Sequence, residues 1–478
     1  MAEGSLTNII RKVVFKAEPY LPQVPKPKKK ISLQVRLLWC GIALLIYMIM
    51  GQTPLFGATA PQFDFLAFAR VIFASQQGTL VELGIGPIVT AGLLMQLLRG
   101  SDILKFDFKK PEERGIFQTA TKLVTYIVIV AESIVYASAV YGPGLTTDPW
   151  VLYVLIGQLM AASIIIMFLD ELIQKGWGLG SGISLFIMAG VAQQILWSMF
   201  SPLPAGDGGM IGIVPYIVQS LTGGGDITNV FFRSNQLPSI FGLCLTAGIL
   251  LVLVFVQGIK IEIPIVSTKY RGFAAVYPIK LMYVSNIPVI LASALTANAV
   301  FIFQMLWANM NPRNNNFFMN FIAQFDPTSP NTPIGGLIYY VTPPRGLGAA
   351  SLDPMRAVGY MLFMIGIVVV FGRLWVELGG LSPKTAAQNL LDADVQIPGF
   401  RRSNAPVEAL LNKYIPSVTI LGSAILGLLA GVSDVLGVFG SGIGILLMVD
   451  ILINYYTQLV REQVEVVMPR LGALLGRK

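Results

Sequence analysis

The chain has 478 residues, of which 54% are hydrophobic and only 12% are charged, and its mean hydropathy is +0.70. A soluble domain carries about a quarter charged residues, so this composition indicates that lipid is the main solvent. The absence of histidine removes the commonest metal ligand and the usual general base near neutral pH. The two cysteines, Cys40 and Cys244, lie in separate apolar runs, which excludes a disulfide framework and a CxxC metal or redox site.

Residues 1–32 form a polar, basic segment with prolines between Pro22 and Lys30. The first long apolar run follows this segment and has no small-residue cleavage site at its end. We therefore expect residues 1–32 to be a retained cytosolic segment rather than a cleaved signal peptide.

Ten apolar runs follow, each of about 15–25 residues, the length that crosses a bilayer core as a helix. Because lipid-facing backbone must satisfy its own hydrogen bonds, these runs predict an all-α membrane protein with ten transmembrane helices. The runs are Leu33–Gly51, Gly84–Leu98, Phe117–Tyr141, Trp150–Leu169, Ile183–Phe200, Pro238–Gln257, Leu281–Trp307, Met355–Trp375, Val418–Val435 and Gly440–Val460.

The distribution of basic residues tests this span count, because Lys and Arg concentrate in cytosolic loops. Ten spans place both termini on one side, and that side receives 28 of the 33 Lys and Arg residues. We therefore predict that both termini are cytosolic and that the net charge of +8 reflects topology rather than nucleic-acid binding. The other side receives Arg70, Arg233, Arg313, Arg345 and Arg356.

The second apolar region is broken. Phe63–Ala74 is a short amphipathic piece, Gln76–Gly78 interrupts the pattern, and Gly84–Leu98 is too short to span without tilt. Broken helices at membrane depth are tolerated where they are buried in protein or line a cavity.

A short repeat occurs at two distant positions of the chain, because the Gly-Ser-Gly-Ile of Gly180–Ile183 recurs at Gly440–Ile443. The two copies begin the fifth and tenth predicted helices, which favours an internal duplication into two pseudo-symmetric inverted five-helix halves. The predicted domains are a first half at 33–200, an external loop at 201–237, a second half at 238–460 and a cytosolic tail at 461–478. The second half contains two charged cytosolic loops, 258–280 and 377–413, that are large enough to dock a partner.

Sites for catalysis are missing from the sequence, which has no Walker loop and no dinucleotide fingerprint between a strand and a helix. We therefore predict no catalytic residues, no metal site and no cofactor. The few ionisable residues inside spans include Glu132, Asp450 and Arg373. Either carboxylate could serve an ion-coupled secondary transporter, or could hydrogen-bond a neighbouring helix for structural reasons.

Several long motifs resemble SecY-type protein translocation channels, and the similarity runs along nearly the whole chain. The archaeal and eukaryotic branch is more similar than the bacterial one, notably at Gly86–Thr90 and Tyr277–Lys280. The motifs are Leu83–Thr90 with Met95–Leu98, Gly178–Ile187, Tyr277–Lys280 with Ser285–Ile290, and the stretch from Phe400 through Lys413–Pro416 to Gly440–Leu447.

This resemblance implies a pore-forming subunit that conducts unfolded polypeptide and opens sideways to lipid. It implies that Phe63–Ala74 is a plug helix that blocks the pore at rest. It also implies an hourglass pore whose waist is a ring of aliphatic side chains, which would be Ile85, Val89, Ile183, Ile187, Ile290 and Leu447. Ile183 and Ile187 are four residues apart on one helix, as are Ile443 and Leu447 in the second copy of the repeat.

Two further sets of residues match positions of the family. Thr90, Glu132 and Asn298 match a polar cluster at the lateral gate, although the eukaryotic branch usually has an amide where this chain has Glu132. The basic residues Lys269, Arg271, Arg401 and Arg402 match positions that contact the ribosome, and cations on a protruding loop can pair with RNA phosphates.

The partners implied are small single-span SecE/gamma and beta-type subunits, the ribosome, signal sequences, nascent chains and the lipid bilayer. A cytosolic motor would suit the basic loops equally well. The implied location is the archaeal cell membrane, or the endoplasmic reticulum membrane in a eukaryote. The alternative function is a secondary transporter with an inverted repeat, which leaves the broken helix and the basic loops unexplained.

Overall fold

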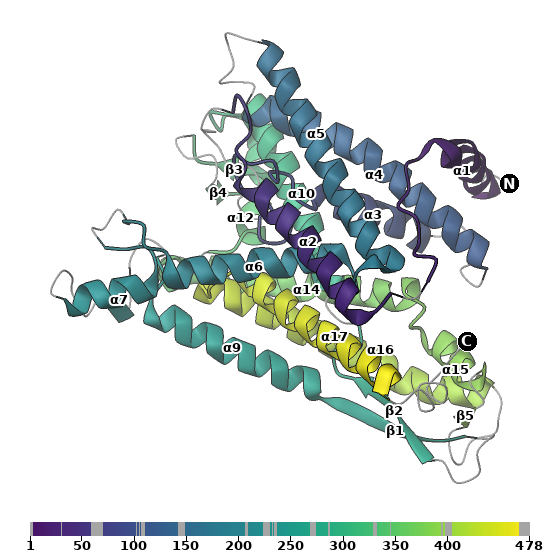
Figure 1. Ribbon diagram of the computed structural model, residues 1–478. Helices are drawn as coiled ribbons and strands as arrows, with labels where there is room; N and C mark the ends of the chain where they lie inside the picture. Colours follow the sequence, from purple (N-terminus) through teal and green to yellow (C-terminus); the bar gives the residue numbers. More distant parts are fainter. Residues whose placement is uncertain are drawn as a thin grey trace. The chain divides into compact units, whose positions relative to one another are not determined.

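The computed structural model describes residues 3–29, 31–58, 70–101, 103–104, 106, 110–141, 149–205, 209–222, 230–231, 233, 237–267, 274–284, 287–327, 332–344, 346–392, 395–396 and 404–467. Helices dominate this part of the chain (Figure 1).

Ten of the helices in the described ranges lie at the ten predicted apolar runs. Nine of them are long and apolar enough to cross a membrane. The tenth, α3, has only 15 residues, as expected for the broken second region. The ten are α2 (Leu33–Gln52), α3 (Gly86–Gly100), α4 (Pro111–Val140), α5 (Pro149–Leu172), α6 (Gly182–Phe200), α9 (Ile240–Gly258), α10 (Ile287–Met310), α14 (Pro354–Leu378), α16 (Asn404–Leu436) and α17 (Gly442–Val467).

Shorter elements connect these helices. The amino-terminal segment forms α1 (Glu3–Ala17), which was not predicted from the sequence. The other elements are η1 (Glu18–Tyr20), η3 (Ile173–Trp177), α7 (Ile213–Leu221), β1 (Lys260–Ser267), β2 (Ala274–Lys280), α11 (Phe317–Ile322), β3 (Gln324–Phe325), β4 (Pro333–Gly335), α12 (Leu337–Val341), α13 (Leu347–Leu352), α15 (Pro383–Asp392) and β5 (Val395–Gln396).

The chain divides into two compact units. Unit 1 comprises Met1–Ile195, Ala297–Gly335 and Leu447–Lys478, and unit 2 comprises Leu196–Thr296 and Gly336–Leu446. Because α10 and α17 each contribute to both units, the units differ in composition from the two predicted five-helix halves, which remain a prediction.

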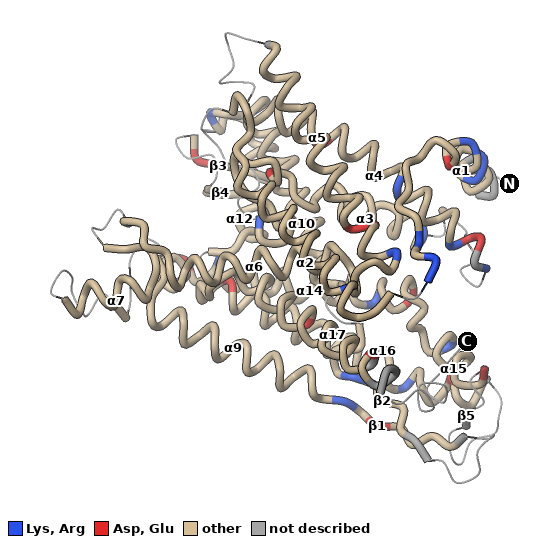
Figure 2. Tube along the Cα trace, viewed as in Figure 1, with Lys and Arg blue, Asp and Glu red and all other residues tan. Residues whose placement is uncertain are grey.

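In unit 1, α1 packs on α4. Val14 of α1 joins an apolar cluster with Ala120 of α4, and α1 carries several basic positions (Figure 2). The Arg11 guanidinium donates two hydrogen bonds to the Glu113 carboxylate, at 2.8 and 2.9 Å. Amphipathic α1 therefore covers the first turns of α4 rather than remaining an extended tail.

In unit 2, the two predicted cytosolic loops build one small folded module. Strands β1 and β2 form an antiparallel hairpin, and β5 from the second loop pairs with β1, giving the strand order β2-β1-β5 (Figure 1). Helix α15 supplies Ala387 and Leu390 to an apolar cluster that also contains Ile263 of β1 and Leu411 of α16. The described parts of the two loops therefore pack together in one module.

The Gly-Ser-Gly-Ile repeat has the same local chemistry in both copies. In unit 1, the backbone N–H of Ile183 donates to the carboxylate of Asp170, at 3.0 Å. In unit 2, the backbone N–H of Gly442 donates to the carboxylate of Asp434, at 2.6 Å. Each aspartate is buried and comes from the end of the preceding long helix, so each satisfies a free N–H group at the start of the next helix.

Candidate functional site

The three residues of the predicted lateral gate lie together in unit 1, on three different helices. The Nδ2 of Asn298 on α10 donates to the Oγ1 of Thr90 on α3, at 3.0 Å. The Glu132 carboxylate on α4 contacts the same Thr90 hydroxyl. Because a hydroxyl both accepts and donates, Thr90 can link the amide to the carboxylate. This polar chain joins α3, α4 and α10.

The contact between α4 and α10 continues next to this cluster, through two aromatic rings that were not predicted from the sequence. Tyr136 lies four residues after Glu132, and its ring stacks on that of Phe301 with centroids 6.2 Å apart and an interplanar angle of 26°. Glu132 and Tyr136 are four residues apart on α4, and Asn298 and Phe301 are three apart on α10. Each pair therefore lies on one face of its helix, and the two faces are in contact. That spacing is the sequence signal that could have identified them.

The predicted ring residues are distributed over both units. Four of them belong to unit 1 and are buried: Ile85 and Val89 at the start of α3, Ile187 on α6 and Leu447 on α17. Ile183 is half-buried on the first turn of α6, and Ile290 is half-buried on α10 in unit 2. Their convergence on one constriction remains a prediction.

The end of the predicted plug contacts this region. Residues 63–69 lie outside the described residues, and residues 70–74 form turns. The Phe73 carbonyl accepts a hydrogen bond from the Ile85 N–H, at 2.9 Å, and the Ala74 carbonyl accepts one from the Tyr47 hydroxyl. The Tyr47 ring stacks on Phe186 of α6 at 4.5 Å. The end of the plug region is thus bonded directly to a predicted ring residue.

Gly84 makes this close approach possible. Its φ is +55°, a conformation that glycine adopts without steric cost. A Cβ atom at this position would overlap the Phe73 carbonyl oxygen and would force the two segments apart. Only glycine therefore fits here.

A buried ionic cluster, which was not predicted from the sequence, fixes the same segment. The carboxylate of Glu82 is fully buried and pairs with Arg70, N to O 2.9 Å. It also accepts hydrogen bonds from the hydroxyls of Tyr136 at 2.5 Å and Tyr141 at 3.3 Å, and from the Gly78 N–H. The cluster ties the chain on both sides of the Phe73 turn to α4.

The four basic residues of the predicted ribosome contact, Lys269, Arg271, Arg401 and Arg402, lie outside the described residues. Their flanking strands are described. Ser267, two residues before Lys269, pairs with Val395, six residues before Arg401. The sheet therefore brings together β1 and β5, the two strands that precede these residues in the sequence.

The carboxylate of Asp450, which could have served a transporter, accepts a hydrogen bond from Asn454 of its own helix at 3.1 Å. Within the described ranges, no group of three or more Cys, Asp or Glu side chains could hold a metal ion.

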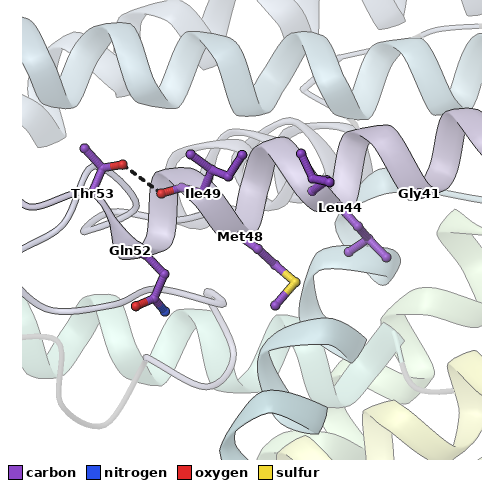
Figure 3. Close-up of a pocket in the computed structure, with 7 residues that line it drawn as sticks. Gly41, Leu44, Met48, Ile49, Gln52 and Thr53 are labelled. Atoms are coloured by element: carbon purple, nitrogen blue, oxygen red, sulfur yellow. Dashed lines mark hydrogen bonds between the residues drawn. The ribbon is translucent and has the colours of Figure 1, made fainter.

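A shallow groove runs along α2 and is lined by Gly41, Leu44, Leu45, Met48, Ile49, Gln52 and Thr53 (Figure 3). It contains none of the predicted site residues.

Comparison with known families gives two matches. Residues 79–456 match the family described as SecY. Residues 45–78 match the family described as the plug domain of Sec61p, and this range contains Phe73, Ala74 and Arg70.

Comparison with individual proteins agrees. The chain is 38% identical over 476 residues to the protein translocase subunit SecY of Pyrococcus horikoshii, covering 97% of this chain and 99% of the relative. It is similar to a solved protein-conducting channel, with a TM-score of 0.80, 36% identity and coverage of 96% and 98%. It is also similar to Sec61 in a canine ribosome–channel complex from the endoplasmic reticulum, with a TM-score of 0.77, 36% identity and coverage of 96% and 98%.

Proposed function

The chain belongs to the SecY family of protein-conducting channels, and we propose that it passes unfolded polypeptide through an aliphatic ring and releases apolar segments sideways into lipid. Its relatives are translocases and conducting channels rather than enzymes or solute transporters. The observation that carries the sideways exit is the hydrogen bond between Asn298 and Thr90, because it joins α10 to α3 through a contact that can break without unfolding either helix.

The ring would consist of Ile85, Val89, Ile183, Ile187, Ile290 and Leu447. Aliphatic side chains fit around a moving extended chain without hydrogen-bonding it, while small ions meet a dewetted barrier. The hydrogen bond from Ile85 to Phe73 supports a plug that rests against this ring.

A segment that reaches the open seam would partition between the pore and lipid. Each central Leu, Ile or Phe favours lipid by about 0.3–0.6 kcal/mol, whereas each Asp, Lys or Arg opposes transfer by about 2.5–3.5 kcal/mol. Apolar segments would therefore leave the pore and polar ones would pass through it.

The proposed partners are the ribosome, through Lys269, Arg271, Arg401 and Arg402, together with SecE/gamma and beta-type subunits, signal sequences and nascent chains. The Sec61 relative in a ribosome complex and the joining of both loop segments by one sheet support the ribosome. We place the protein in the cell membrane of an archaeon with both termini in the cytosol, as the distribution of basic residues and the Pyrococcus relative favour.

The gate can be tested by the hydrophobicity that a segment needs for insertion. A hydrogen bond between membrane helices contributes about 0.6 kcal/mol on average, which equals the contribution of about one or two leucines. We expect Asn298→Ala to lower the insertion threshold by about one leucine, measured with a graded series of Leu/Ala test segments.

Asn309→Ala is the matched control, because Asn309 lies on the same helix and bonds only its own turn, at the Met305 carbonyl. Its threshold should equal that of the unmodified protein. If Asn298→Ala and Thr90→Val both behave like this control, the assignment of the polar gate is wrong.

A further inference from the structure

Helix α11 exposes a cluster of large apolar side chains just beyond the end of α10. The exposed fractions are 79% for Phe317, 81% for Phe318 and 65% for Phe321. Three exposed phenylalanines within five residues are unusual for a surface that faces only water.

The cluster continues an exposed stripe of α10. Ile302, Leu306 and Met310 are all exposed, and their spacing of four residues puts them on one face of the helix. Because α10 is long and apolar enough to cross a membrane, an exposed apolar face of this kind is suited to contact with lipid. Met310 is the last residue of α10 and is 70% exposed, so the exposed apolar stripe leads toward α11.

A network of amide side chains fixes the turn between the two helices. The Trp307 indole N–H donates to the Asn314 side chain at 2.7 Å, and Asn311 donates to Asn320 at 2.8 Å. The side chain of Asn316 caps α11 by accepting from the Phe318 N–H at 3.1 Å. Trp307 is buried on α10, so these bonds hold α11 to the helix end instead of leaving it on a loose loop.

We propose that α11 is an interfacial anchor, with Phe317, Phe318 and Phe321 inserted at the boundary between headgroups and acyl chains beside the external end of α10. Exposed Arg313, in the connecting turn, is placed to pair with a lipid phosphate. A lipid surface is the favoured partner because the phenylalanines extend the exposed apolar stripe of a helix long and apolar enough to span a membrane, and apolar elements of this kind lie in the interface plane. The proposal does not depend on conduction of polypeptide.

Spin-label accessibility in proteoliposomes tests the anchor. A nitroxide label is attached to Phe318→Cys and, in a separate protein, to Phe321→Cys. Both variants also carry Cys244→Ala, so the buried Cys40 is the remaining native cysteine. The Cys244→Ala protein without a new cysteine measures the background labelling of Cys40. Ile302→Cys gives the lipid reference. Lys28→Cys, at an exposed position of the amino-terminal segment, gives the water reference.

We expect both labels on α11 to resemble the Ile302 label, with high collision rates for oxygen and low rates for a water-soluble nickel chelate. The oxygen-to-nickel ratio should exceed that of the Lys28 label several-fold. A ratio equal to that of the Lys28 label would overturn the proposal in favour of water exposure. Low accessibility to both reagents would overturn it in favour of a protein partner.

Discussion

Glu82 and Glu113 are two glutamates of unit 1 that each bind an arginine in different surroundings. The Glu82 side chain is fully buried and that of Arg70 is 15% exposed, whereas the pair of Glu113 and Arg11 is partly exposed. Removing one partner of a buried pair leaves an uncompensated charge and costs about 3–5 kcal/mol. An exposed pair contributes about 0–1 kcal/mol.

We therefore expect Glu82→Gln to destabilise the protein by about 3 kcal/mol, and Glu113→Gln by less than about 1 kcal/mol. Thermal or denaturant unfolding in detergent micelles measures both changes. Equal losses in the two variants would show that burial does not set the strength of the Glu82 pair.

The contact between Thr90 and Asn298 was predicted only because the resemblance named both residues. The bond between Thr90 and Asn298 joins residues 208 positions apart, and only the match to a family cluster placed them together. No pattern paired Glu82 with Arg70, because Arg70 lies in the broken second region, whose path depends on Gly84, Tyr136 and Tyr141. The cluster around Glu82 could therefore be identified only from the structure.

The turn from the plug region into α3 depends on one glycine. A side chain at Gly84 would clash with the Phe73 carbonyl, and the left-handed conformation would cost about a further 1–2 kcal/mol. We expect Gly84→Ala to displace Phe73 from Ile85 and to increase ion leakage through resting channels in planar bilayers.

Gly92→Ala is the control for this element. Gly92 lies within α3, and a Cβ there would meet nothing within 4 Å. Alanine is also the better helix former by about 0.5–1 kcal/mol. Leakage that rises equally in both variants would rule out displacement of Phe73 as the cause.

At the scale of elements, hydropathy located nine long helices and the shorter α3, but not all of their ends. The predicted run began at Val418, whereas α16 begins at Asn404, because its first turns are amphipathic and contain Pro416 within the helix. The β1 strand was missed although Ile261, Ile263 and Ile265 alternate along it, a period of two that is typical of a strand. The charged residues around this strand are typical of a loop, and for this reason the alternation was not interpreted as a strand.

The repeat was predicted from four residues, and the structure shows that the two copies also share a backbone conformation and a hydrogen-bonding pattern. Gly180 and Gly440 both have positive φ, +69° and +77°, and a buried aspartate binds the start of the following helix in each copy. The aspartates could not be found by aligning the copies, because Asp170 precedes Gly182 by 12 residues and Asp434 precedes Gly442 by only eight.

At the scale of the whole molecule, the basic loops should govern attachment to the ribosome. We expect Arg271→Glu and Arg401→Glu to weaken ribosome binding, because in the proposed contact each arginine would pair with an RNA phosphate and release counterions. The slope of log affinity against log salt should fall by about one for each arginine that is replaced.

Binding measured across a salt series with purified ribosomes checks this expectation, with Lys16→Glu as a control of equal charge change on the exposed side of α1. Affinity at low salt that is unchanged in both loop variants would contradict docking through these loops. An equally large decrease of affinity in Lys16→Glu would show that the change in net charge alone explains the effect.

The short pairing of β5 with β1 joins the two strands that precede the basic residues in the sequence, so the proposed ribosome contact would be bivalent. If both segments bind phosphate, attachment of one would present the other to the same surface at a high effective concentration, and the joint affinity would exceed that of either alone. Separating β5 from β1 should therefore weaken ribosome binding while leaving every cation in the chain. Charge reversal in either segment should then change the affinity less than it does in the intact sheet, because the two segments would no longer reinforce each other.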